Sequence, residues 1–155
     1  MSRIDHICLM ANYNGWMNTK LYEAAMSLPG KELIAHRKAF FGSILGTLNH
    51  LAVGDTIWLK RFATHPANYS ALELVGNLPT PASLDQLLYT DVQSLSNHRR
   101  SLDQVITEWA HSITDHDLAV TSRTIIRTFM EQVRVRGVPL LHRLHRCFAL
   151  EHRLR

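Results

Sequence analysis

The chain has 155 residues, of which 46% are apolar and 19% are charged, a size and composition that suit one folded domain and exclude a disordered chain. No uncharged apolar run approaches the roughly 20 residues of a membrane helix, and the first residues lack the apolar segment of a signal peptide. We therefore expect one domain over residues 1–155, in the cytoplasm and without a membrane partner. Cys8 and Cys147 are expected to be reduced.

The first half of the chain predicts two long helices. Residues 3–28 carry apolar side chains at helical spacing and end at Pro29-Gly30, a pair that stops helices. Residues 41–63 repeat the pattern, with Ser43 as the expected N-cap. Gly46 and Gly54 in this second helix each cost about 1 kcal/mol relative to alanine. We therefore expect both glycines to lie against a neighbouring helix or an open cleft.

A long connection and a third helix follow. Residues 65–82 are punctuated by proline and glycine, as connections are. A capping-box pattern at residues 83–86 predicts that the third helix starts there and continues to Ile113. Arg99 and Asp103 are spaced as an i, i+4 pair, which we interpret as lying on the exposed side of this helix.

Residues 120–155 form an atypical tail with no clean period, although residues 140–154 have the spacing of a last helix. We therefore predict an all-α fold, an antiparallel four-helix bundle. The sequence pattern leaves open whether the last of the four helices forms. One core should bury six side chains of the second and third helices: Leu45, Leu48, Leu59, Leu95, Leu102 and Trp109.

Ten histidines are a high count, and imidazole is the commonest metal ligand in proteins. We interpret His98 as a core histidine bonded to a neighbour, because it lies on the apolar stripe of the third helix. Five others lie near helix ends or in loops and are interpreted as exposed: His6, His36, His65, His111 and His116.

Polar residues at apolar positions need partners. Asp55 lies near the centre of the second helix's stripe, where a carboxylate must be paired or hydrogen-bonded. We expect tyrosine, tryptophan or backbone donors in the core to supply those bonds. Three asparagines of the first helix are interpreted as a structural polar patch inside the bundle: Asn12, Asn14 and Asn18.

His50 lies about a third of a turn off the stripe of its helix. Gly46 and Gly54 lie at i−4 and i+4, on the same face and without side chains. The imidazole could therefore stand in a gap that a ligand can reach. Alternatively, the glycines could serve helix packing and His50 could be incidental. The spacing alone leaves both interpretations open.

Three histidines of the tail, His142, His145 and His152, would share one face of a last helix. Arg146 and Arg153 would share that face, and their charge would repel a cation. We interpret this face as exposed and basic.

Several stretches of the chain together carry a family resemblance, and they occur in a fixed order. They are NYNGWMN at residues 12–18, FGSILGTLNHL at 41–51, GD at 54–55, IWLKRF at 57–62, RRSLD at 99–103, and Trp109.

Across residues 4–118 these motifs resemble the DinB family, which is named for damage-inducible genes. Members include thiol-dependent transferases and isomerases, and hydrolases of small thiol conjugates. The resemblance implies a four-helix bundle with an unusual connectivity, often a homodimer, that holds a divalent cation (zinc, nickel or iron) through three histidines. His50 matches the first of these ligands. The metal would act as a Lewis acid and lower the pKa of a bound thiol or water.

The chain departs from the family where the other two ligands belong. In the family they form an H-x-x-x-H pair in the last helix, and this chain contains no such pair. A changed reading frame near residue 120 would explain the tail, and we favour that account. Divergence, with His142 and His145 as substitute ligands, is the alternative.

Three functional hypotheses follow. The first is a metal-dependent enzyme of the thiol-transferase or hydrolase type, acting on a small thiol or thiol conjugate. The second is a folded but catalytically incomplete family member. The third, ranked last, is an anion or nucleic-acid binder that uses residues 123–155, which hold eight Arg and two Glu but no interleaved aromatic pattern. Zinc sites usually need three or four ligands, so we predict weak or absent metal binding.

Overall fold

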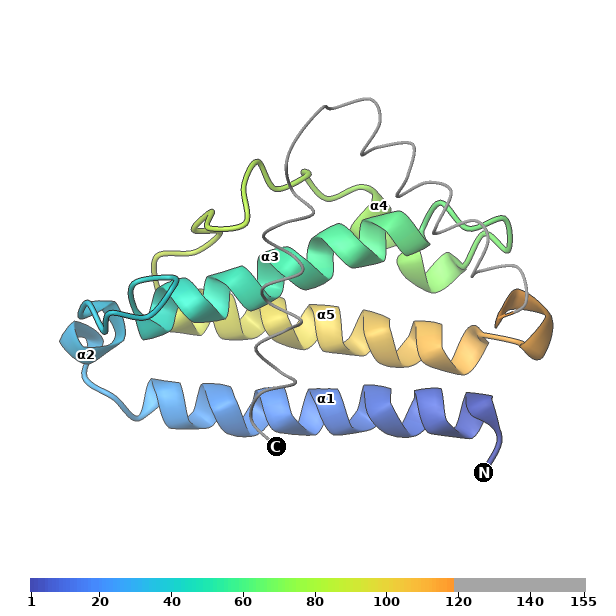
Figure 1. The fold of residues 1–155 in the computed structure, drawn as a ribbon, viewed down its shortest axis with the longest axis horizontal. Helices are drawn as coiled ribbons and strands as arrows, with labels where there is room; N and C mark the ends of the chain where they lie inside the picture. Colours follow the sequence, from blue (N-terminus) through green and yellow to red (C-terminus); the bar gives the residue numbers. More distant parts are fainter. Residues whose placement is uncertain (119–155) are drawn as a thin grey trace. The chain divides into compact units, whose positions relative to one another are not determined.

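The structure is a computed structural model that describes residues 1–118. Three long helices dominate this part, and shorter helices interrupt the connections between them (Figure 1). No named strand occurs among the described residues, and the all-α class is confirmed. No helix in this range is both long enough and apolar enough to cross a membrane. The elements are α1 (Arg3–Met26), α2 (Gly30–Ile34), α3 (Ile44–Phe62), η1 (Ser70–Leu72), α4 (Glu73–Gly76) and α5 (Val92–Ser112).

The first two long helices begin where local side-chain bonds predict. At the start of α1, the amide of Asp5 donates to the Ser2 hydroxyl over 3.0 Å, and the Ser2 amide donates to the Asp5 carboxylate over 2.8 Å. At the start of α3, the amide of Gly46 donates to the Ser43 hydroxyl over 3.0 Å. The Ser43 N-cap and the stop before Pro29 are therefore confirmed.

The predicted start of the third helix is wrong. α5 begins at Val92, capped by Asp91, whose carboxylate accepts from the amide of Ser94 over 2.7 Å. The reason is the buried side chain of Asn49 in α3, whose Oδ1 atom accepts from the amides of Leu88 and Tyr89 over 2.8 and 3.0 Å. These bonds hold the backbone at residues 88–89 in a loop.

The connectivity differs from that of a plain antiparallel bundle, and the family resemblance implies an unusual connectivity. In Figure 1, α3 and α5 run in the same direction and α1 runs opposite to both. The connection between α3 and α5 must therefore return along the whole length of α3. Side chains of α3 bind it on the way: the ammonium of Lys60 donates to the carbonyls of Gly76 and Leu78 over 2.8 and 2.6 Å. His50 and Asn49 bind it further along, at residues 84 and 88–89.

The predicted core is confirmed for the five leucines, which are each at most 5% exposed. Trp109 is only half-buried and packs against the margin of this core. Residues 1–118 form one compact unit. The last helix, predicted within residues 140–154, lies outside the described residues. The organisation of residues 1–155 as a single domain therefore stays a prediction.

Candidate metal site

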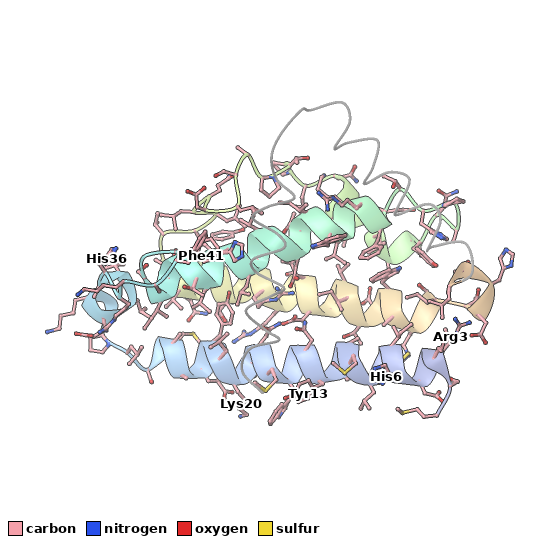
Figure 2. The ribbon with its side chains drawn as sticks, viewed as in Figure 1. Arg3, His6, Tyr13, Lys20, His36 and Phe41 are labelled. Carbon is pink, nitrogen blue, oxygen red and sulfur yellow. The ribbon has the colours of Figure 1, made fainter. Side chains whose placement is uncertain are left out.

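His50 lies two turns into α3 and is held by two contacts. Its ring stacks on that of Phe41, with centroids 3.6 Å apart and planes inclined by 18°. Its Nδ1 atom lies 2.8 Å from the carbonyl oxygen of Leu84. Phe41 lies beside the first turns of α3 (Figure 2). The imidazole is therefore clamped between the segment before the helix and the connection that returns along it.

The contact with Leu84 determines which ring nitrogen of His50 carries the proton. A carbonyl oxygen can only accept a hydrogen bond, so Nδ1 must donate and the neutral ring must be unprotonated at Nε2. Metal-binding histidines typically have this arrangement, in which a backbone carbonyl orients the ring and the other nitrogen keeps its lone pair. Within residues 1–118, no hydrogen bond engages Nε2. His50 thus presents one oriented donor atom.

The two glycines that flank His50 have different surroundings. A Cβ atom at Gly46 would collide with the carbonyl oxygen of Phe41, so this glycine permits a close approach of backbone. At Gly54 no neighbouring atom of residues 1–118 lies within 4 Å of the same position. The prediction of a neighbouring helix or an open cleft is therefore wrong for Gly46, whose close neighbour is the backbone of Phe41 in the segment before α3.

The described residues do not complete a metal site. Within residues 1–118, no group of three or more His, Cys, Asp or Glu side chains could hold an ion together. His142, His145 and His152 lie outside the described residues, as does the basic segment 123–155. The donor set available in the described part is therefore too small for the divalent cation that the resemblance implies.

Asp55 is paired, but not with the expected partner. Its Oδ2 atom accepts from Nη1 of Arg99 over 2.5 Å. Nη2 of Arg99 forms an ion pair with Asp103 over 2.9 Å. Arg99 is 2% exposed and the side chain of Asp103 is 14% exposed. The prediction that these two residues lie on the exposed side of α5 is wrong, because the α3 carboxylate draws the guanidinium inward.

The carboxylate of Asp103 extends this network to α1. Its Oδ1 atom accepts from the side-chain amides of Asn14 and Asn18 over 3.2 and 2.8 Å. Burial raises the pKa of Asp103, an effect that Arg99 and Asn18 oppose. The polar patch predicted inside the bundle is confirmed for these two asparagines. It is wrong for Asn12, which is exposed.

The buried hydroxyl of Tyr22 lies in the same region and has no hydrogen-bond partner among the described residues. Burial raises the pKa of Tyr22 to about 12, and the charges of Arg99, Asp103 and Asp55 also act on it. Aspartate, asparagine and tyrosine side chains from three helices thus lie around Arg99. Sequence reasoning missed the central role of Arg99, and also missed Asn49. The signal for Asn49 was a polar residue within an apolar stretch of the second helix.

Most of the other histidines have the exposure that the sequence predicted. His98 is half-buried beside Tyr89, with ring centroids 5.3 Å apart. The predicted bond to a neighbour is wrong for its buried Nε2, which has no hydrogen-bond partner among the described residues. His65 was expected to be exposed and is 5% exposed, because its ring stacks on Tyr69 and its Nδ1 accepts from the amide of Ala67. The remaining four histidines predicted to be exposed are so: His6, His36, His111 and His116.

Comparison with known proteins finds one family. The model described as DinB family matches residues 1–135, and thus continues beyond the residue 118 at which the sequence motifs end. No curated protein and no solved structure matches significantly.

Proposed function

Since the chain belongs to the DinB family, we propose that it is built on the framework of a divalent-metal-dependent enzyme of the thiol-transferase or hydrolase type. His50 is the metal ligand that this framework supplies. The observation that carries the proposal is the bond from His50 Nδ1 to the Leu84 carbonyl, which places the lone pair of the neutral ring on Nε2. The substrate class is a small thiol or thiol conjugate.

The same bond also has a structural role, which supports a second candidate function. His50 binds the returning connection, as Lys60 and Asn49 do, so the imidazole has a reason to be there without any metal. The described residues supply one donor where three are needed. We therefore propose that this 155-residue chain binds a divalent cation weakly and has little metal-dependent activity. His142 and His145, if brought to His50, would change that outcome.

Metal analysis of the untagged protein tests both candidates. We would measure zinc, nickel and iron per chain in the wild type, in His50→Ala and in His111→Ala. The last is the matched control, because His111 is exposed at the end of α5. We expect substoichiometric metal in all three proteins. Circular dichroism would show whether His50→Ala keeps its helices after losing the bond to Leu84.

Two results would contradict the proposal in different ways. Near-stoichiometric metal that His50→Ala removes and His111→Ala keeps would show a complete site, and so overturn weak binding. His142→Ala and His145→Ala would then identify the remaining ligands. Near-stoichiometric metal that survives in a folded His50→Ala protein would show that His50 is no ligand. Turnover of a small thiol conjugate, measured with and without added cation, would complete the comparison.

A further inference from the structure

The segment between α1 and α3 forms a basic tip at the end of the bundle where α1 ends and α3 begins (Figure 1). We define the basic tip as residues 30–42, which include α2. It carries three cations, Lys31, Arg37 and Lys38, and a single carboxylate, Glu32. That carboxylate is already paired with Arg37. Among the described residues no ion pair engages either lysine, so both ammonium groups are available to a partner.

The basic tip also exposes two large apolar side chains. Ile34 at the end of α2 is 66% exposed, and Phe40 in the loop that follows is 83% exposed. Leu33 of the same helix is only 5% exposed and packs in the core, so the tip is anchored by a different side chain. One exposed apolar residue is ordinary on a protein surface. Two of them beside unpaired cations have the composition of a docking surface.

The loop that carries Phe40 is closed by its own bonds. The amide of Arg37 donates to the carbonyl of Gly42 over 2.6 Å. Lys38 has a φ of 56°, in the left-handed region that costs energy in any residue other than glycine. The ring of Phe40 meets that of Phe41 edge-on, with centroids 4.8 Å apart. The local structure therefore holds Phe40 in its exposed position.

The charge of the basic tip disfavours a partner from this protein itself. Residues 123–155 hold eight Arg and two Glu, so that segment has the same sign of charge as the tip. A second copy would bring an identical tip on a chain whose net charge is +4. The complementary partner is therefore anionic and comes from outside the chain.

Among anionic partners, the size and side chains of the tip favour a lipid bilayer. A specific protein interface needs about 800 Å² from each partner, more than a tip with two large exposed apolar side chains offers. Single-stranded nucleic acid is bound by several stacking rings along a basic groove, whereas Phe40 is the one exposed aromatic ring of the tip. A bilayer needs neither, because apolar side chains enter its headgroup region while lysines attract anionic lipids.

We propose that the basic tip docks reversibly on a membrane surface that contains anionic lipids. Phe40 and Ile34 enter the headgroup region, and Lys31 and Lys38 bind the anionic headgroups. The expectation of no membrane partner rested on the lack of an apolar run that could span the bilayer, and a tip that enters only the headgroup region needs no such run. Neither His50 nor a metal takes part, so failure of this proposal would leave the proposed function untouched.

The first test is binding of the untagged full chain to vesicles, measured by co-sedimentation. We expect binding to vesicles of phosphatidylcholine and phosphatidylserine in equal parts, and at least tenfold weaker binding to phosphatidylcholine alone. Lys31→Gln/Lys38→Gln should weaken the binding about tenfold. The matched control is Arg3→Gln/Arg100→Gln, which removes the same charge from exposed positions of α1 and α5. It should weaken the binding about twofold or less.

The second test locates the contact, because the basic residues 123–155 could also attract the chain to anionic vesicles. On vesicles, Phe40→Trp should shift its emission to the blue and be quenched by lipids with brominated acyl chains, after subtraction of the signal of the three native Trp residues. The matched control is Leu74→Trp, at a 74% exposed leucine of α4, which should show neither effect.

Three results would overturn the proposal, provided that circular dichroism shows each variant to be folded. One is vesicle binding that the double lysine variant leaves unchanged. Another is equal quenching of Phe40→Trp and Leu74→Trp. The third is a wild type that binds single-stranded DNA through the tip and does not bind the anionic vesicles.

Discussion

Arg99 of α5 donates to Asp55 of α3, with Nη1 2.5 Å from Oδ2, and the same guanidinium pairs with Asp103 one turn further along α5. Asp103 in turn accepts from two asparagines of α1. A single buried cation thereby links all three long helices. Breaking a buried pair by removing one partner is costly because it leaves the other charge uncompensated.

We predict that Arg99→Met lowers the free energy of unfolding by about 3 kcal/mol. Most of that loss should come from Asp103, since Asp55 is 41% exposed and solvent can compensate its charge. Urea unfolding would measure the change. Arg100→Met is the control, because Arg100 is exposed and its loss should change stability by less than about 0.5 kcal/mol. Equal effects of the two variants would show that the network contributes little.

The glycines of α3 predict opposite outcomes for the same substitution. Gly54→Ala meets no neighbouring atom within 4 Å in the part of the chain that the structure describes. It should stabilise the protein by up to about 1 kcal/mol, the helix preference for alanine over glycine. Gly46→Ala should destabilise it, because the new methyl group collides with the Phe41 carbonyl. Thermal unfolding would measure both. If Gly46→Ala also stabilises the protein, the segment before α3 is not held against the helix.

Leu48 lies in the leucine core and is only 2% exposed, so we expect its truncation to lower the free energy of unfolding strongly. Leu48→Ala should cost about 2–5 kcal/mol through lost burial and the cavity that remains. Leu74→Ala is the matched control, since Leu74 is 74% exposed. Chemical denaturation of both variants would test the packing, and a Leu48→Ala protein as stable as the control would contradict it.

His98 predicts a dependence of stability on pH. Burial, together with the positive charge of Arg99, lowers the pKa of His98 below its ordinary value of 6.5. The unfolded chain therefore takes up a proton that the folded chain does not. The His98 contribution to the free energy of unfolding should fall as pH falls below about 6.5, with a slope of at most about 1.4 kcal/mol per pH unit. Folded protein at different pH values would be unfolded in urea, and His98→Gln should show a shallower slope than the wild type.

Much of the fold follows from sequence alone, because it depends on neighbours within a few residues. The starts of α1 and α3 depend on Ser2 and Ser43 bonding amides three residues ahead. The leucine core depends on helical spacing. His50 was singled out by the two glycines one turn away and by its place in the family pattern, although its role as a ligand stays a prediction.

Other features of the fold depend on partners that lie far along the chain. α5 starts at Val92 because Asn49, some 40 residues earlier, binds the backbone at 88–89. Arg99 is buried because its partner Asp55 lies 44 residues away on α3. Spacing within one helix cannot reveal such partners, since it shows which face a side chain lies on but not what another element brings to that face. Local sequence therefore determines where most helices form and which apolar side chains are buried in the core. Tertiary contacts determine which polar side chains are buried and how α3 and α5 are oriented.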